Sequence, residues 1–254
     1  MKKNIVFVGG TGSLSQSIVK SLIKLNTKIA ILDLPSSKLK KLDKFKNVKT
    51  IQTDISNELR FKNSFFDAKR YLKRIDVVVN CASITSEFFK ESNNYFNEFH
   101  NYDLETWNKS ISVNLTGVFL SCRESIKVMI KQKYGKIINF SSLYGLVSPN
   151  FNLYKNENFN TPASYSASKS GVVGLSKWIA VNYARYGITV NIVSPGGVYN
   201  NQSKSFVKKY SNLNPSNRMA NKDDLNSLLK FLIFENNSYI NGHNFVVDGG
   251  FSVW

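Results

Sequence analysis

The stretch at residues 4–15, N-I-V-F-V-G-G-T-G-S-L-S, joins an apolar run to a glycine-rich turn. The run from Asn4 to Val8 has the composition of a buried strand, and a helical pattern follows the turn through Leu25. A strand, a glycine turn and a helix in this order direct backbone N–H groups and a helix N-terminus toward a pyrophosphate. Gly9 and Gly12 are present, whereas Ser15 stands where a third glycine would allow close packing. The stretch predicts the first unit of a dinucleotide-binding fold.

A second expected strand, at residues 28–33, ends in an acid. Asp33 lies roughly 20 residues beyond the glycines, the distance at which an acid binds a ribose 2′-hydroxyl. A carboxylate there repels a 2′-phosphate, so Asp33 favours NAD over NADP. Lys38, Lys40 and Lys41 follow closely and weaken this preference.

The rest of the chain repeats the strand and helix alternation. Further strands are expected at 48–53, 75–79, 135–142, 188–193 and 244–247, most of them preceded by helical segments. The pattern predicts an α/β protein, a Rossmann-type doubly wound parallel sheet of about seven strands with helices on both faces. Ligands bind such sheets beyond the carboxyl ends of the strands, where Gly9, Asp33, Asp54 and Asn80 fall. Asp54 has an alternative interpretation as a helix cap.

Length and composition limit the class of protein. With 254 residues, 42% of them hydrophobic, the chain is expected to form a single domain, residues 1–254. No apolar run approaches the roughly 20 residues that span a bilayer, so we expect a cytoplasmic protein without a membrane partner. Cys81 and Cys122 lie far apart without a histidine cluster, which argues against a disulfide framework and against a metal site.

The formal net charge of +17 has three interpretations. The lysines are spread along the chain among many asparagines and accompany no recognisable RNA- or DNA-binding motif, so we do not expect a nucleic-acid partner. Lysine-rich surfaces also follow from a biased base composition of the gene. Part of the charge can steer anionic ligands such as phosphates.

Tyr165 and Lys169 stand four residues apart in S-Y-S-A-S-K, which opens a long helical pattern. Residues at i and i+4 lie on one face of a helix, so the phenol and the ammonium group should share a small volume. A nearby cation favours the phenolate, which would let Tyr165 exchange a proton with a substrate oxygen. An isolated pair at this spacing is usually an ordinary exposed Tyr and Lys.

Two other features precede this helix in the sequence. A helix expected from Asp103 or Leu104 toward Lys133 places Asn114 on an apolar face, where its amide needs partners and could simply bond a backbone carbonyl. Before that helix, residues 84–103 are rich in aromatic side chains that either cover a cleft or pack against the body. His100, in the same stretch, is expected to be a bystander.

These motifs, taken together, resemble the short-chain dehydrogenase/reductase family along nearly the whole chain. The ordered matches are the glycine turn, Asp54, N-C-A-S at 80–83, S-V-N-L at 112–115, I-I-N-F-S-S at 137–142, Y-S-A-S-K at 165–169 and S-P-G-G at 194–197. The resemblance implies a catalytic tetrad of Asn114, Ser142, Tyr165 and Lys169. Ser142 would orient the substrate carbonyl, and Tyr165 would act as general acid or base. Lys169 would hold the ribose and lower the tyrosine pKa, while Asn114 would position a proton-relay water.

The resemblance also implies a nicotinamide cofactor site. The residues expected to form it are Gly9, Thr11, Gly12, Ser13, Leu14, Asp33, Asp54, Ile55, Asn80, Ala82, Tyr165, Lys169, Pro195, Gly196, Val198 and Asn200. The sequence departs from the family pattern at Ser13 and Ser15, which replace glycines, and at Asn200, which replaces a threonine.

Between Ser142 and Tyr165 the chain carries a longer insert than most family members, near residues 143–162, expected to shape the substrate pocket. With the segment at 194–202, it resembles a bacterial subgroup associated with flagellin glycosylation and surface polysaccharide sugars. This implies an alcohol and ketone pair on a sugar, sugar phosphate or nucleotide sugar, and an anionic sugar would suit the basic composition. The polar segment near 199–218 is expected to be a lid or a plain surface excursion.

The resemblance further implies a homodimer or homotetramer, with the helices of Asn114 and Tyr165 and the C-terminal strand at the interfaces. Burial would suit the terminal residues Phe251 to Trp254. Two alternatives to a sugar oxidoreductase remain open. One is a 3-oxoacyl reductase, and the other is a dinucleotide-sensing protein without turnover, an idea that the serines in the glycine turn motivate.

Overall fold

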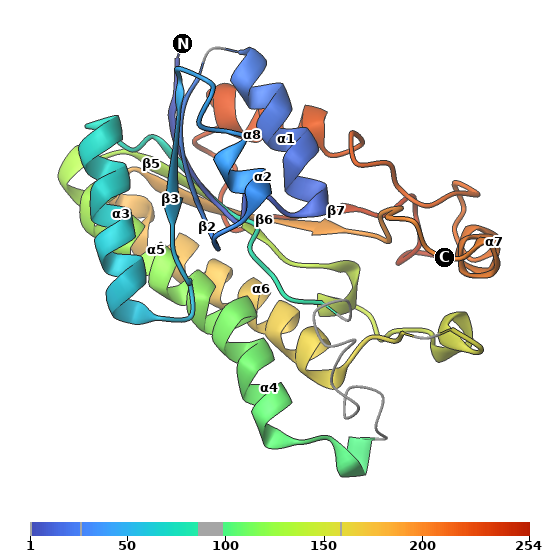
Figure 1. Ribbon diagram of the computed structural model, residues 1–254. Coiled ribbons are helices and arrows are strands. Elements are labelled where there is room, and N and C mark those ends of the chain that lie inside the picture. The colour runs from blue at the N-terminus through green and yellow to red at the C-terminus, as the bar shows by residue number, and fades with distance from the viewer. Residues whose placement is uncertain (1, 26, 86–98, 158) are drawn as a thin grey trace.

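The computed structural model describes residues 2–25, 27–85, 99–157 and 159–254. They form a seven-stranded sheet in the order β3-β2-β1-β4-β5-β6-β7 (Figure 1). Every neighbouring pair of strands is parallel. The strands are β1 (Asn4–Val8), β2 (Lys28–Asp33), β3 (Val48–Gln52), β4 (Val77–Asn80), β5 (Gly135–Phe140), β6 (Ile188–Pro195) and β7 (Asn244–Val247). The predicted doubly wound parallel sheet is confirmed.

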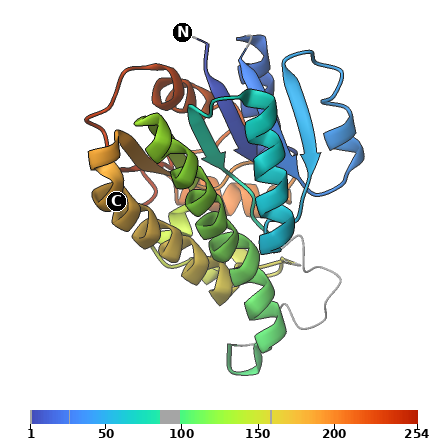
Figure 2. The same cartoon turned by 90° about the vertical axis from the view of Figure 1, so that its left-hand side faces the viewer.

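Helices cover both faces of the sheet. They are α1 (Ser13–Lys24), α2 (Ser37–Lys40), α3 (Glu58–Leu72), α4 (Leu104–Ile111), α5 (Gly117–Gln132), α6 (Ala163–Tyr183), α7 (Lys204–Asn212) and α8 (Asn226–Phe234). Figure 2 shows α3, α5 and α6 side by side in front of the sheet, while α1 and α8 lie behind it.

Alternation along the buried strands builds a hydrophobic core on each face. In β1, Val6 and Val8 join the core under α3, α5 and α6, whereas Ile5 and Phe7 join the core under α1 and α8. Because successive strand side chains point to opposite faces, a run in which every residue is apolar can supply both cores at once. This is why β1 is apolar at every position after Asn4.

The strand order reverses between β1 and β4, which are neighbours in the sheet although two strands separate them in sequence. A crevice forms beyond the carboxyl ends of the strands at such a switch point, because the connections leave in opposite directions. Gly9 lies there, and its backbone N–H donates to the Leu32 carbonyl at 2.8 Å. A ligand site is therefore expected at this end of the sheet.

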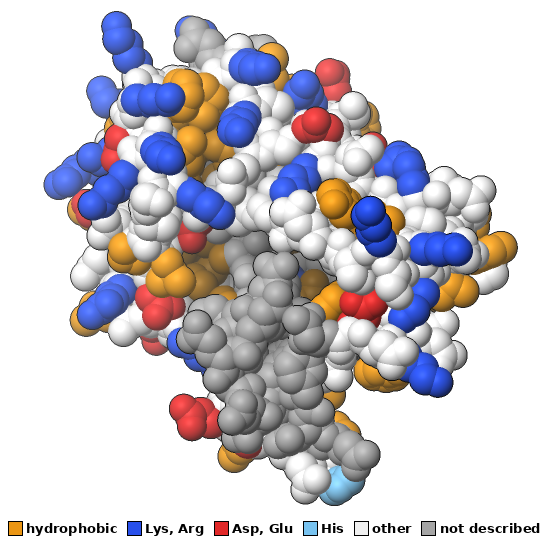
Figure 3. Space-filling view, turned by 45° about the vertical axis from the view of Figure 1, so that its right-hand side comes forward, with side chains coloured by type: hydrophobic (Ala, Val, Ile, Leu, Met, Phe, Trp, Pro, Cys, Tyr) orange, Lys and Arg blue, Asp and Glu red, His pale blue; other side chains and the backbone are white. Residues whose placement is uncertain are grey.

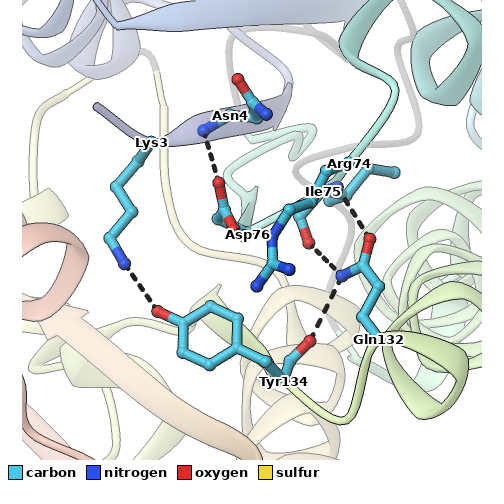
Figure 4. Close-up of polar contacts among 7 residues, drawn as sticks. All are labelled: Lys3, Asn4, Arg74, Ile75, Asp76, Gln132 and Tyr134. Atoms are coloured by element: carbon cyan, nitrogen blue, oxygen red, sulfur yellow. Dashed lines mark hydrogen bonds and ion pairs between the residues drawn. The ribbon is translucent and has the colours of Figure 1, made fainter. Parts of the chain in front are cut away.

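At the opposite end of the sheet, where β1 and β4 begin, polar side chains bond to one another and to the backbone (Figure 4). The Asp76 carboxylate accepts hydrogen bonds from the Asn4 backbone N–H at 3.0 Å and from Arg74 Nε at 2.6 Å. The Gln132 amide bonds both the N–H and the carbonyl of Ile75, at 3.1 and 2.7 Å. These bonds tie the starts of β1 and β4 to each other and to the end of α5.

The helix expected from Asp103 or Leu104 toward Lys133 is present but changes its winding. Asp103 caps α4 by accepting from the Thr106 backbone N–H at 2.7 Å. A π-helical segment, Ser112–Thr116, then joins α4 to α5, and Lys133 ends α5 in a left-handed conformation with φ of 51°. A π-helical turn is rare and frequently marks a functional site, and this one contains Asn114.

Residues 199–218 contain helix α7, which the weak periodicity of the segment did not predict. Phe206 and Tyr210 of α7 are buried in a small core together with Leu153 and Met219. At the C-terminus the Trp254 side chain is 73% exposed within one chain. The aromatic stretch before α4 falls largely outside the described residues, including Phe88, Phe89, Tyr95 and Phe96. No described helix is long and apolar enough to span a bilayer.

Candidate active site

Helix α6 carries Tyr165 and Lys169 on one face, one turn apart. Lys169 Nζ lies 5.6 Å from the centre of the Tyr165 ring. Ser141, just beyond β5, donates from its hydroxyl to the Lys169 carbonyl at 2.8 Å and so fastens this turn of α6 to the sheet edge. The phenol and the ammonium group therefore meet at the carboxyl edge of the sheet, beside the end of β5.

Ser142 lies against the phenol. Its side chain is hydrogen-bonded to Tyr165, and its oxygen accepts from the Tyr144 backbone N–H at 3.2 Å. Burial raises the pKa of Tyr165, and the bond to Ser142 opposes the rise without cancelling it. The net shift is therefore upward, because loss of solvent outweighs the stabilisation of the phenolate by Ser142, and the expected lowering by Lys169 stays a prediction. At neutral pH the phenol is protonated.

Lys169 is buried, with 2% of its surface exposed. Its ammonium group donates to the Phe140 carbonyl at 3.1 Å. Burial lowers the pKa of Lys169 to about 8, and Cys81 opposes this only weakly. Because a pKa near 8 leaves most of the lysine protonated at pH 7, the site holds a cation beside a neutral phenol.

Two buried lysines should each add to the free energy of unfolding a contribution that rises with pH. Burial also lowers the pKa of Lys136 to about 8, and its ammonium group bonds the carbonyls of Leu232 and Glu235. A lysine in the unfolded chain titrates near 10.4, so above pH 8 the unfolded state binds more protons than the folded state, and the free energy of unfolding increases. From pH 8 to 9.5 each lysine should contribute roughly 1–2 kcal/mol.

Chemical denaturation of the wild type and of the Lys169→Met and Lys136→Met variants at several pH values measures this slope. Each variant should lose part of the rise, and the exposed Lys177→Met variant controls for removal of one positive charge. Burial raises the pKa of Cys81 and Cys122, which opposes the rise within this range, so the quantity compared is the difference in slope between each variant and the wild type. The range stops at pH 9.5 because tyrosines also ionise above it. Equal slopes in all four proteins would show that neither buried lysine titrates in this range.

Asn114 is fully buried in the π-helical segment. Its Oδ1 accepts from the Ile84 N–H at 2.8 Å and from the Ser83 hydroxyl at 3.1 Å, and its Nδ2 donates to the Ile84 carbonyl at 3.0 Å. The amide thus anchors the loop after β4 and does not line the cavities described below. A part in a proton relay would have to run through its backbone or through that loop.

The glycine turn and the end of β2 form a rigid cradle. Asp33 Oδ2 accepts from the backbone N–H and the hydroxyl of Thr11, at 2.7 and 2.8 Å, and Asp33 Oδ1 accepts from the Leu34 N–H. Gly12 precedes α1 and offers no side chain to cap it. The first N–H groups of a helix lack partners within the helix, so this end suits an anion.

Ser15, the residue in the third glycine position, is almost fully buried. Its side chain is hydrogen-bonded to the thiol of Cys81, whose pKa is raised by burial. The space between α1 and the loop after β4 therefore accommodates a hydroxyl group, because that group has a polar partner. Ser13 is exposed at the start of α1 and lines the cavity.

Two adjoining cavities run along this edge, of about 790 and 390 Å³, within the range of small-molecule sites. They share Thr11, Gly12, Lys38, Cys81 and Ser83. The smaller cavity reaches Asp33 and Asp54. Burial works against ionisation of Asp54, but bonds from Ser56 and the charges of Lys109 and Arg60 hold its pKa below the ordinary value.

The expected cofactor residues lie around these cavities with one exception. Those that line them are Gly9, Thr11, Gly12, Ser13, Leu14, Asp33, Asp54, Ile55, Ala82, Tyr165, Lys169, Pro195, Gly196, Val198 and Asn200. The Asn80 side chain instead turns inward, donating to Asn139 Oδ1 at 2.8 Å and accepting from the Ser121 hydroxyl at 2.6 Å. An anion-binding helix end, an acid at the ribose position and a continuous groove between them fit a nicotinamide dinucleotide.

The insert and the segment around α7 close the outer end of the larger cavity, and both lie beyond the same end of the sheet in Figure 1. The Tyr154 ring packs 5.6 Å from Phe206 and 5.7 Å from Phe159, centre to centre. The Tyr154 hydroxyl also donates to the Tyr144 hydroxyl at 2.9 Å and lies 2.7 Å from Thr161 Oγ1. These contacts fix the wall that faces Tyr165.

Several lining residues have no motif in the sequence. On the cofactor side they include Lys38 and Lys109. On the outer side they include Tyr144, Glu157, Phe159, Asn160, Thr161, Asn201, Gln202 and Ser203. The available signal was position alone, since all of the outer residues lie in the insert or just after S-P-G-G.

Comparison with known proteins gives consistent matches over the whole chain. A family model described as enoyl-(acyl carrier protein) reductase matches residues 9–252. Post-translational flagellin modification protein A of Campylobacter coli is 28% identical over 262 residues, which cover 100% of both chains. A 3-oxoacyl-(acyl-carrier-protein) reductase of Buchnera aphidicola is 34% identical over 180 residues, covering 69% of this chain and 66% of the relative.

Solved structures agree with the sequence matches. A short chain dehydrogenase from Leptospira borgpetersenii with bound NAD+ has a TM-score of 0.89 and 30% identity, covering 100% of this chain and 94% of that one. The match of the family model to most of the chain, the parallel sheet and the groove at its switch point lead to one conclusion. This chain belongs to the short-chain dehydrogenase/reductase family and is an NAD(P)-dependent oxidoreductase.

Proposed function

We propose that this enzyme interconverts an alcohol and a ketone on a sugar, sugar phosphate or nucleotide sugar used to build a surface glycan. The observation that carries the proposal is the cavity itself. Ser142, Tyr165 and Lys169 meet at its inner part, and its outer wall offers hydroxyl, amide and carboxylate groups from Thr161, Asn160, Gln202, Ser203 and Glu157. Such a lining suits a substrate with many hydroxyl groups.

In the proposed reaction, Ser142, Tyr165 and Lys169 have different roles in proton transfer at the substrate oxygen atom. The Ser142 hydroxyl bonds the substrate oxygen and orients it toward the phenol. Tyr165 donates its proton to that oxygen in reduction or removes one in oxidation, with the Lys169 ammonium group stabilising the phenolate. The glycine turn, Asp33 and Lys169 would hold the nicotinamide dinucleotide, which when bound supplies or accepts the hydride. The positioned acid is worth typically about 10²- to 10⁴-fold in rate.

The relatives favour two substrate classes. The match to a flagellin modification protein spans both chains completely and supports a glycan role. The match to a 3-oxoacyl-(acyl-carrier-protein) reductase supports an acyl thioester as the second candidate. The polar outer wall favours the sugar, because a sugar can exchange hydrogen bonds with its hydroxyl, amide and carboxylate groups and an acyl chain cannot.

We further propose that NAD is preferred over NADP. Asp33 lines the smaller cavity, where Thr11 and Leu34 fix its carboxylate, and a 2′-phosphate beside it would meet like charge. Lys38 lines the same cavity and moderates this repulsion. The structure at 30% identity contains NAD+, which agrees with the proposal.

A homodimer or homotetramer in the cytoplasm completes the proposal. Large apolar side chains on three helices of one face are exposed in the single chain, among them Leu104, Phe119, Trp178 and Val181. Contact between copies would cover them. Lysine and arginine side chains are scattered over the face seen in Figure 3. Sedimentation analysis measures the assembly.

Turnover assays test the proposal directly. Purified enzyme should oxidise or reduce at least one member of a panel of free, phosphorylated and nucleotide-linked sugars, with NAD used at least about tenfold more efficiently than NADP, since like-charge contact costs several kcal/mol. Acetoacetyl thioesters serve as the matched alternative. Efficient use of thioesters without any sugar turnover would overturn the sugar assignment.

A further inference from the structure

Glu157 is a buried acid at the outer end of the larger cavity. It lies in the insert, three residues after the 3-10 turn Phe151–Tyr154, and only 7% of its side chain is exposed. The cavity lining includes Glu157 together with Ser203, Asn160 and Gln202. Tyr165 and Lys169 line the same cavity. A carboxylate in this place is costly unless bonded groups compensate for its lost hydration.

The partners of Glu157 compensate for this charge only in part. The Ser203 hydroxyl lies 3.0 Å from Oε1 and 2.8 Å from Oε2, but it has one proton to donate. Lys209 Nζ is 3.8 Å from Oε1, at the outer limit of an ion pair, and it already donates to the Lys155 carbonyl at 2.6 Å. An ionised carboxylate accepts about four hydrogen bonds. The carboxylate, which belongs to the cavity lining, therefore has acceptor capacity left.

The charges of the other lining residues also affect which ligands can bind near Glu157. Among described residues that line the larger cavity, the cations are Lys38 and Lys169, and both belong to the cofactor side. An anionic substituent at the outer end would thus meet the Glu157 carboxylate without a lining cation. Contact between like charges costs enough binding free energy to separate two ligands that differ only in charge.

We propose that Glu157 determines substrate specificity by accepting hydrogen bonds from a donor group of the sugar, a hydroxyl or an ammonium group, and by rejecting a phosphate or carboxylate at this end of the cavity. The inference rests on the proposed sugar function and narrows it. It places any anionic group of the substrate away from the outer end of the cavity. The anionic sugar expected from the basic composition would therefore have to bind with its charged group elsewhere in the cavity.

A charge-matched ligand series tests the inference. Glucose, glucosamine and glucuronate, each free and linked to UDP, are titrated by calorimetry into enzyme saturated with NAD, and turnover is measured in parallel. Wild type should bind the glucose or glucosamine members at least about tenfold more tightly than the glucuronate members, because charged hydrogen bonds and like-charge contact both act. Glu157→Gln should weaken the preferred member about tenfold and narrow that ratio.

Three comparisons make the outcome decisive. Glu105→Gln, on the exposed surface of α4, should change nothing. Ser203→Ala removes the bond to Glu157 but keeps the charge, so discrimination against glucuronate should persist. Weakening confined to glucosamine in Glu157→Gln identifies the ammonium group as the donor, whereas weakening of glucose as well identifies the hydroxyls.

The failure modes of the two proposals differ. If wild type binds sugars but Glu157→Gln affects all members equally, Glu157 only joins the insert to α7 and the inference is overturned. Preference of wild type for glucuronate also overturns it. If wild type neither binds nor turns over any member, the sugar function itself fails and the inference fails with it.

Discussion

Replacing Tyr165 with phenylalanine should lower kcat by about 10²- to 10⁴-fold while leaving the fold and cofactor binding nearly unchanged. The change removes a single oxygen atom, the one that is hydrogen-bonded to Ser142. The ring keeps its packing and its place near Lys169 Nζ. Steady-state rates with the sugar substrates, together with titration of NAD by fluorescence, measure the two properties separately.

Tyr144→Phe is the matched control for that experiment. Tyr144 lines the same cavity, burial raises its pKa, and its hydroxyl accepts from Tyr154 rather than from the catalytic serine. Loss of one neutral hydrogen bond should cost about tenfold or less. Equal losses in both variants would mean that Tyr165 contributes binding and not proton transfer, and the proposed mechanism would be abandoned.

The pH dependence of Tyr165 was harder to predict than its position. Spacing alone placed Tyr165 and Lys169 together, since helix geometry is local and regular. The direction of the pKa shift depends on how much solvent the whole fold removes, because burial raises the pKa of this phenol and its hydrogen bond to Ser142 lowers it. Burial is the larger effect for Tyr165. No sequence motif indicates which of these two opposed effects on the pKa is larger, because both arise from tertiary packing.

The sheet was predictable because its central strands, such as β1 and β4, are buried on both faces and are therefore apolar at most positions. Helix α7 was not, because it packs on a small core formed by distant residues such as Leu153 and Met219. Its helical pattern becomes visible only when Phe206 and Tyr210 are known to face that core. Glu157 escaped prediction for a related reason, since its partner Ser203 stands 46 positions away.

Asn80 and Asn114 show a further limit of reasoning from motifs. Both follow the family pattern, yet both amides are used up in bonds within the protein. A motif marks where a residue stands in the chain and does not give the direction of its side chain. The resemblance therefore identifies the neighbourhood of the site more securely than it identifies each contact.

Gly9→Ala should destabilise the fold by about 3 kcal/mol or more, since backbone strain and steric overlap act at the same position. Gly9 has φ of +81°, a conformation that disfavours any Cβ. A Cβ built there lies 2.4 Å from both the N and the Cα atoms of Ala82. Because the close neighbours are backbone atoms, relief requires separating β1 from the loop after β4. That separation also opens the groove expected to hold the dinucleotide, so cofactor affinity should fall as well.

Two further variants separate strain from a general effect of replacing glycine. Gly174, on an exposed part of α6, has nothing within 4 Å of an added Cβ, so Gly174→Ala should be neutral or stabilise the protein by up to about 1 kcal/mol. Adding Ala82→Gly to Gly9→Ala removes only the Ala82 Cβ, 2.9 Å away, and leaves the closer backbone atoms in place. Chemical denaturation should therefore show little rescue in the double variant. Full rescue would place the conflict in the side chain, and a Gly9→Ala protein as stable as wild type would mean that the glycine turn is not held in this conformation.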